Sequence, residues 1–137
     1  MEGKGQPTWQ PISALGLIAS IIDAQVQDGR DQHKLLSKAR PYVLDDATVE
    51  RLLRVYGETA EDLWLYDEQL ARWEAQAISS AQRREVQRLK SQMADLRDVV
   101  EQILALGARL KGETIEVLLA KSDIEIGIEG LLGRRER

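Results

Sequence analysis

Residues 79–111 have the sequence SSAQRREVQRLKSQMADLRDVVEQILALGARLK. Apolar side chains recur in it at alternating steps of three and four, a heptad stripe that keeps one side of a helix facing a partner. Only Gly107 interrupts the stripe. Ser79 followed by Gln82 is a capping-box pattern, so the sequence predicts a helix over residues 80–111. The stripe consists of Val86, Leu89, Met93, Leu96, Val100, Ile103 and Leu110.

The residues before this stretch repeat the pattern and predict a second long helix over 46–77. Asp45 or Asp46 can accept backbone N–H bonds at its start. The serine pair at 79–80 is the break that lets the two helices fold back as a hairpin. Without that break the same residues would form one unbroken helix, used as a coiled-coil rod, and this alternative remains open.

A third long helix is predicted at the N-terminal side, over residues 12–39. Pro11 suits a helix start, because its missing N–H would be unpaired there in any case. Pro41 ends the helix by disfavouring helical geometry at the residue before it. Gly29 costs about 1 kcal/mol relative to Ala in a helix interior, so a kink or break at this position is an alternative.

The C-terminal residues predict two short helices. The first covers 113–120, and a capping-box pattern of Ser122 and Glu125 starts the second. Residues 124–128 also alternate between apolar and polar or small side chains, as a strand would. A lone strand has no partner in this chain, so a helix is the preferred interpretation.

These elements together predict an all-α fold, an elongated antiparallel bundle of three long helices with two short C-terminal helices. The C-terminal segments cap one end of the bundle or complete a four-helix core. Residues 1–10 are expected to form a flexible arm, with Trp9 either docked on the bundle or free. Residues 11–132 form the single domain, and 133–137 a disordered basic tail.

Composition limits the function classes. The chain has 137 residues and no Cys, which excludes disulfides and thiolate metal sites. Its formal net charge of −4 argues against sequence-independent binding to nucleic acid or anionic membranes. The longest apolar run, 12–22, is about half of the roughly 20 residues that span a membrane. No secretory signal is recognisable, so we expect a cytoplasmic protein.

Two acidic residues, Asp67 and Glu74, fall within the apolar face of the second helix. A buried carboxylate is costly unless it is paired. If the chain reverses near residue 79, Glu74 lies near Arg83 and Asp67 near Lys90, so salt bridges across the hairpin explain both. An alternative is a helical-bundle enzyme or ligand carrier that uses the two carboxylates.

No catalytic residues, metal or cofactor are predicted. His33 is the only histidine, lies in phase with the apolar stripe and lacks companion ligands. Basic residues cluster between Arg83 and Lys90, and a small regulatory protein contacting nucleic acid through this turn is a further alternative. The length of the helices and the acidic net charge disfavour it.

Surplus apolar surface predicts a homodimer. The first helix carries a second apolar row outside its core stripe, and the second helix adds two large side chains at or beyond the edge of its own. Two-fold pairing is the commonest way to cover such surface, although the C-terminal segments could fold back over it instead. The expected function is therefore a non-enzymatic, self-associating bundle with a structural or adaptor role, and a further protein partner is an open alternative. The candidate interface residues are Leu17, Ile21, Leu35, Trp64 and Leu65.

Overall fold

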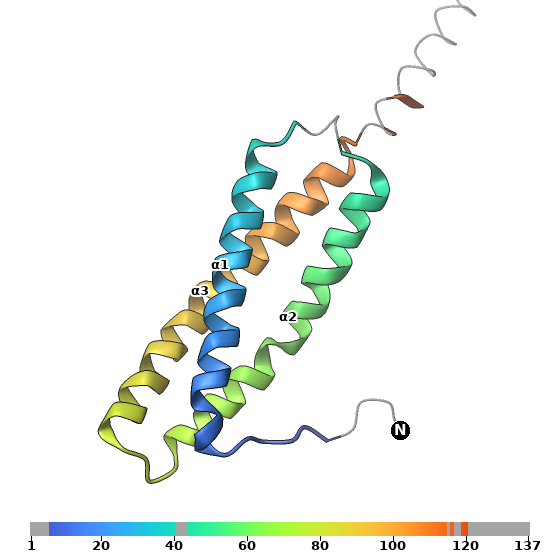
Figure 1. Cartoon of the computed structure of the whole chain (residues 1–137). Coiled ribbons are helices and arrows are strands. Elements are labelled where there is room, and N and C mark those ends of the chain that lie inside the picture. Colours follow the sequence, from blue (N-terminus) through green and yellow to red (C-terminus); the bar gives the residue numbers. More distant parts are fainter. Residues whose placement is uncertain (1–5, 41–43, 115, 117–118, 121–137) are drawn as a thin grey trace, which may run out of the picture.

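Three long helices make up the computed structural model, which describes residues 6–40, 44–114, 116 and 119–120. A short 3-10 helix, η1 (Ile12–Ala14), leads into α1 (Leu15–Lys38). It is followed by α2 (Asp46–Glu74) and α3 (Ser80–Lys111). The helices run up, down and up again to form an elongated bundle (Figure 1). The predicted all-α fold with three long helices is confirmed, and the described residues contain no strand.

The predicted helix boundaries are close to those observed. The side chain of Asp45 accepts a hydrogen bond from the backbone N–H of Thr48 at 2.7 Å. Ser79 and Gln82 form the capping box at the start of α3, with bonds of 3.1 and 2.9 Å. The two caps satisfy backbone donors that the first helical turn leaves unpaired. The break at Ser79 therefore produces a hairpin, and the unbroken rod is not formed.

The second helix ends at Glu74, three residues earlier than predicted. The guanidinium group of Arg83 explains this end, because it donates to the backbone carbonyls of Glu74 and Gln76 at 3.1 and 3.2 Å. Those carbonyls lie at or beyond the helix end, where they have no partner within the helix. Arg83 thus fixes the turn between α2 and α3, an interaction that the periodicity of α2 does not reveal.

The centre of the fold is α3, because both other helices pack against it while α1 and α2 make few direct contacts with each other. All seven residues of its predicted stripe are buried, and Val99 and Leu106 widen the buried surface toward a second neighbour. From α1 the core receives Ile22 and Val26, and from α2 Leu70 and Trp73. The bundle is therefore two helix pairs that share α3.

Two helical glycines mark the places where the helices come closest. A Cβ atom built on Gly29 of α1 would lie 2.9 Å from Cγ1 of Val99. A Cβ atom on Gly107 of α3 would lie 2.8 Å from Cδ2 of Leu53. Gly29, where a kink or break was the alternative prediction, instead lies inside a continuous helix. Its missing side chain allows close approach, which offsets its low helix propensity.

The part of the N-terminal arm that the structure describes is packed against α2. The buried side chain of Gln69 accepts a hydrogen bond from the backbone N–H of Gln10 at 2.6 Å. The indole N–H of Trp73 donates to the carbonyl oxygen of Gln10 at 2.9 Å. Of the two arrangements considered for Trp9, the structure shows the docked one, with its ring against Trp64.

The predicted short C-terminal helices and the alternative strand at 124–128 lie largely or wholly outside the described residues. Two described residues after α3 return the chain to the start of α2. The Thr114 hydroxyl donates to the Asp46 carboxylate, and the Glu116 carboxylate accepts from the Asp46 backbone N–H at 3.0 Å. Among the described helices, none has the length and apolar character needed to cross a membrane.

Candidate interaction groove

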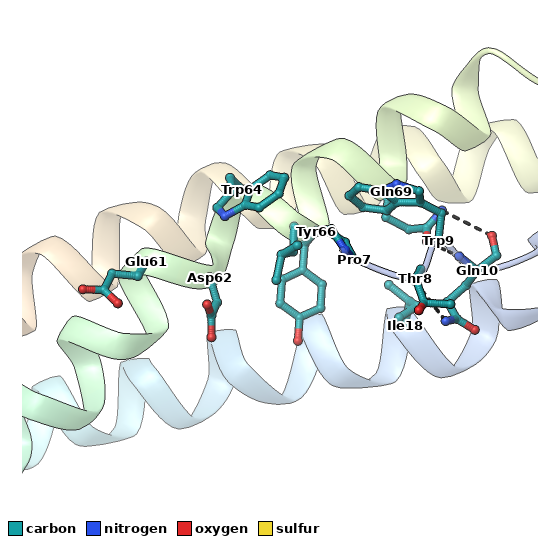
Figure 2. Close-up of a pocket in the computed structure, with 11 residues that line it drawn as sticks. Pro7, Thr8, Trp9, Gln10, Ile18, Glu61, Asp62, Trp64, Tyr66 and Gln69 are labelled. Atoms are coloured by element: carbon teal, nitrogen blue, oxygen red, sulfur yellow. Dashed lines mark hydrogen bonds between the residues drawn. The ribbon is translucent and has the colours of Figure 1, made fainter. Parts of the chain in front are cut away.

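An open groove lies between α1 and α2, on the side of the bundle away from their contacts with α3. It consists of two neighbouring hollows of about 530 and 250 Å³ that share Asp62 and Tyr66. Figure 2 shows both of these side chains pointing from α2 toward α1. The N-terminal arm closes one end of the groove. Its walls are formed by Ile18 and Gln25 of α1 and by Val55, Glu58, Thr59, Glu61, Asp62, Leu65 and Tyr66 of α2. We call this feature the α1–α2 groove.

The α1–α2 groove combines apolar walls with acidic charge. Ile18, Leu65 and Tyr66 supply apolar surface, and all of the ionised side chains that line the two hollows are carboxylates. These are Glu58, Glu61 and Asp62, which lie close together along α2. A site of this character favours an apolar segment that also carries positive charge.

One polar atom in the α1–α2 groove has no partner. The side-chain oxygen of Gln25 is buried, yet it accepts no hydrogen bond from the described part of the chain. Leaving a buried acceptor unsatisfied costs about 1–3 kcal/mol. Gln25 lies in the hollow that is also lined by Val55 and Thr59. The acceptor thus lies beneath the surface of the smaller hollow, enclosed by the protein.

Aromatic side chains cluster where the N-terminal arm crosses α2. The rings of Trp9 and Trp64 meet edge to face with centroids 6.3 Å apart. The guanidinium carbon of Arg72 lies 4.5 Å from the centroid of the Trp9 ring, in a cation–π arrangement. Such contacts are each worth about 0.5–1.5 kcal/mol. They hold the arm in place and leave Trp64 53% exposed.

The five candidate interface residues occupy two surfaces. Leu17 and Leu35 on α1 are 65% and 67% exposed, and Ile21 beside them is half-buried. Leu65 is half-buried and lines the α1–α2 groove. Trp64 also contributes to this hollow, but its ring points to the other side of α2 from Tyr66 (Figure 2). The five residues therefore do not form one continuous patch.

The predicted carboxylates on α2 form ion pairs with α3, but with different basic residues. The Glu74 carboxylate pairs with Lys90 at 2.9 Å, and Asp67 pairs with Arg97. Arg83 reaches Glu74 only at its backbone carbonyl. Each acidic side chain thus meets a basic residue one heptad further along α3 than predicted. Because a heptad stripe repeats every seven residues, it defines the facing side well and the register poorly.

The pKa of the Glu74 carboxyl is lowered from its ordinary value, mainly by its hydrogen bond to Lys90 and also by that from Gln87. Both carboxylates are at least 30% exposed, so they are surface ion pairs of the hairpin and not buried polar core residues. Exposed pairs of this kind contribute little to stability, because water and salt screen the charges. Their hydrogen bonds occupy the groups that an acid–base site at these positions would use.

Most of the basic residues after the turn are also engaged within the chain. Arg88 forms ion pairs of 2.9 Å with Asp23 of α1 and 2.8 Å with Glu85 of its own helix. These hydrogen bonds lower the pKa of both carboxyl groups and raise that of Arg88. Arg83 donates to backbone carbonyls and Lys90 pairs with Glu74. The cluster therefore serves mainly to connect α3 to the other helices. It offers few free cations to a phosphate backbone.

His33 lies half-buried in a shallow hollow between α1 and α3, beside Arg30, Asp95 and Asp98. Arg30 and Asp95 form an ion pair of 3.2 Å across this hollow. Within the described part of the chain, no three His, Cys, Asp or Glu side chains are placed to hold a metal ion together. The surroundings of His33 are thus those of a polar helix contact.

Apart from Leu65, sequence reasoning missed the residues that build the α1–α2 groove. Gln69 and Gln25 appear in the sequence as ordinary polar residues, and neither stands out from its neighbours. The one available signal was Trp73, whose indole N–H needs an acceptor when the ring is buried. That acceptor is the backbone of Gln10, so the buried tryptophan predicts some docked segment without identifying it.

No protein-family model, curated protein or solved structure matches the chain. The fold and the groove define its class, an all-helical bundle whose first two helices leave an open groove. The functional argument therefore rests on the residues described above.

Proposed function

We propose that this protein is a non-enzymatic, self-associating helical bundle with a structural or adaptor role, and that it acts as a homodimer. The observation that carries the proposal is the pair of exposed leucines on α1. Leu17 and Leu35 are 65% and 67% exposed, although both are large apolar side chains. They lie about five turns apart at 3.6 residues per turn, and therefore on the same side of the helix.

The position of these leucines suits a two-fold interface. In such an interface residue i of one copy contacts residue j of the other, and the reverse contact also forms. If two copies of α1 pair antiparallel about a point near Val26, Leu17 of each copy meets Leu35 of the other. Ile21 adds half-buried apolar surface, and the small side chain of Ala24 near the axis permits close approach.

An adaptor role is supported by what the other candidate residues do. Asp67, Glu74, Arg83 and Lys90 are engaged in contacts that hold the hairpin together. The exposed surface instead offers apolar side chains on α1, an exposed tryptophan on α2 and the acidic α1–α2 groove. Surfaces of this kind bind protein segments more readily than they bind small polar substrates.

The test is the molar mass of the full chain by light scattering coupled to size exclusion, at micromolar concentration. The proposal predicts twice the chain mass of 15.4 kDa. A double variant, Leu17→Glu with Leu35→Glu, is expected to have the mass of one chain and unchanged helical circular dichroism. A mass of one chain for the unmodified protein would contradict the proposal.

A matched control separates the loss of apolar contact from the added charge. Ser20→Glu with Gln27→Glu places the same additional charge on exposed polar positions of α1. This variant should remain dimeric. If it dissociates as completely as the leucine variant, electrostatic repulsion explains the result and the leucine interface is wrong.

A further inference from the structure

Two properties of the α1–α2 groove favour an occupant. The groove is open along two adjoining hollows, and its ionised lining is entirely acidic. Val55, on the wall opposite Gln25, is 44% exposed. A segment seated there would cover apolar surface and neutralise carboxylates.

After α3 the chain returns to the start of α2, which lies beyond the open end of this groove. After α3, the side chains of Thr114 and Glu116 bind the first residue of α2, Asp46. About twenty residues follow Glu116. As a helix they would extend about 30 Å, whereas the helical rise from Asp46 to Asp62 is about 24 Å. The C-terminal residues are therefore long enough to reach the acidic part of the groove.

The side chains of this segment complement the groove when both the segment and α2 are followed from their N-terminal ends. Ile124, Ile128 and Leu131 recur at helical spacing and form one apolar side. Arg134, Arg135 and Arg137 follow them. A helix running parallel to α2 from the level of Asp46 carries the three apolar residues past Val55 and Thr59. By the same helical rise, the arginines follow at about the level of residues 64–67, about one turn beyond Glu61 and Asp62.

The acidic residues at the start of the segment also have counterparts. Asp123 and Glu125 lie near its start, and the exposed arginines Arg51 and Arg54 precede the acidic residues that line the groove. From Arg51 to Asp62 the groove side of α2 is thus basic and then acidic, and from Asp123 to Arg135 the segment is acidic, including Glu129, and then basic. A parallel arrangement matches opposite charges at both ends, whereas an antiparallel one opposes like charges.

We propose that the α1–α2 groove is the docking site for residues 121–137 of the same chain, which lie parallel to α2 and complete a four-helix bundle. The tether through Thr114 and Glu116 keeps the segment at a high effective concentration, which favours docking within one chain over docking between chains. The proposal goes beyond the dimer, because the groove is distinct from the Leu17 and Leu35 side of α1. Either proposal can fail without the other.

Because the chain has no Cys, introduced cysteines report on this contact alone. Thr59 lines the groove, and Gly127 lies on the apolar side of the segment at about the level of residue 57 or 58 by helical rise. The full chain with Thr59→Cys and Gly127→Cys is oxidised under mild conditions. The products are separated without reductant to distinguish bonds within a chain from bonds between chains.

The control moves one cysteine by a single residue to another side of α2. Ala60 lines a hollow between α2 and α3 and does not line the groove. The pair Thr59→Cys with Gly127→Cys should form an intramolecular disulfide at least ten times faster than Ala60→Cys with Gly127→Cys. Equal rates for the two pairs would overturn the proposal. A disulfide that forms only between chains would assign the groove to a second copy and would also overturn it.

A labelling experiment keeps the test independent of disulfide geometry. The single variant Thr59→Cys is treated with a maleimide, alone and combined with Ile124→Asp and Ile128→Asp. Loss of the two apolar anchors should raise the labelling rate about tenfold, because the thiol is no longer covered. Glu61→Lys with Asp62→Lys should raise it as well, and less so at high salt. An unchanged rate in the aspartate variant would show that the segment does not lie in the groove.

Discussion

The surfaces of α1 and α2 that face α3 differ in composition and burial from the surfaces that face each other. Toward α3, the helices present periodic rows of Leu, Ile and Val that are almost completely buried. Toward each other, they present a mixed surface with acidic residues, an exposed Val55 and an unpaired Gln25. The contrast shows that a single shared helix organises the fold, and that the surface between α1 and α2 is left open.

The largest expected effect is a charge in the contact with α3. Leu96 is 1% exposed at the centre of α3, and an unpaired carboxylate there costs several kcal/mol. This approaches the whole stability of a small domain, about 5–15 kcal/mol. Leu96→Asp should therefore unfold the protein, as measured by circular dichroism and urea denaturation.

The matched change in the α1–α2 groove is Val55→Asp, at a side chain that is 44% exposed. It should leave the described helices folded, because it can only weaken the contact between the groove and residues 121–137, and its loss of stability should be well below that of Leu96→Asp. If both aspartate variants melt at the same temperature, the distinction between the two sides of the bundle is wrong.

A second prediction concerns close approach at Gly29. Alanine there would place a Cβ atom 2.9 Å from the stiff side chain of Val99, and the overpacking should cost about 1–3 kcal/mol. Gly57 of α2 has no atom within 4 Å of such a Cβ. Gly57→Ala should therefore stabilise the protein by about 0.5–1 kcal/mol through helix propensity. Shifts of the same sign in the urea midpoint would contradict this account.

A smaller effect is expected where the arm is tied to α2. Gln69→Leu removes the acceptor for the backbone N–H of Gln10 and should cost about 0.5–1.5 kcal/mol, because Gln10 is exposed to water. It should also loosen Trp9 from Trp64 and change the tryptophan fluorescence. Gln102→Leu, at an exposed position of α3, serves as the control and should change neither quantity. Unaltered fluorescence in the Gln69 variant would show that the arm is held by other contacts.

The smallest effect belongs to the exposed ion pair of Asp23 and Arg88. The hydrogen bond from Arg88 lowers the pKa of the Asp23 carboxyl below its ordinary value of 3.8. A lowered pKa stabilises the fold above pH 3.8, and the contribution is lost as the pH falls through the lower pKa of the folded state. Both side chains are more than 40% exposed, so screening limits the contribution to about 1 kcal/mol.

Urea denaturation of the unmodified chain and of Asp23→Asn, repeated from pH 7 to pH 2, measures this contribution. The two stabilities should differ at neutral pH and converge at the acidic end. A difference that grows as the pH falls would have the wrong sign for this pair.

Much of the fold was predictable because helix caps and heptad stripes are local signals. Asp45, Ser79 and Gln82 locate helix starts, and the stripe of α3 identifies its buried side without knowledge of the partner. The register between α2 and α3 was not predictable in the same way. A shift of seven residues leaves every stripe position in phase, so Glu74 meets Lys90 where Arg83 was expected.

The groove was harder to predict because it depends on where helices do not touch. Its position follows from the close contacts at Gly29 and Gly107, which draw α1 and α2 onto α3. In the sequence, Gly29 appeared as a possible kink in the first helix and Gly107 as an interruption of the heptad stripe. Leu65 was identified as an exposed apolar residue, but its neighbours Glu61 and Asp62 gain meaning only from the three-dimensional arrangement.

The central claim is that α3 is the shared core on which α1 and α2 pack separately. Amide hydrogen exchange at increasing sub-denaturing urea tests it directly, because exchange reports the local free energy of opening. We expect the slowest exchange in the middle of α3, from Met93 to Val100, with amides there opening only on global unfolding. The same or slower exchange in the middle of α1 or α2 would contradict the claim.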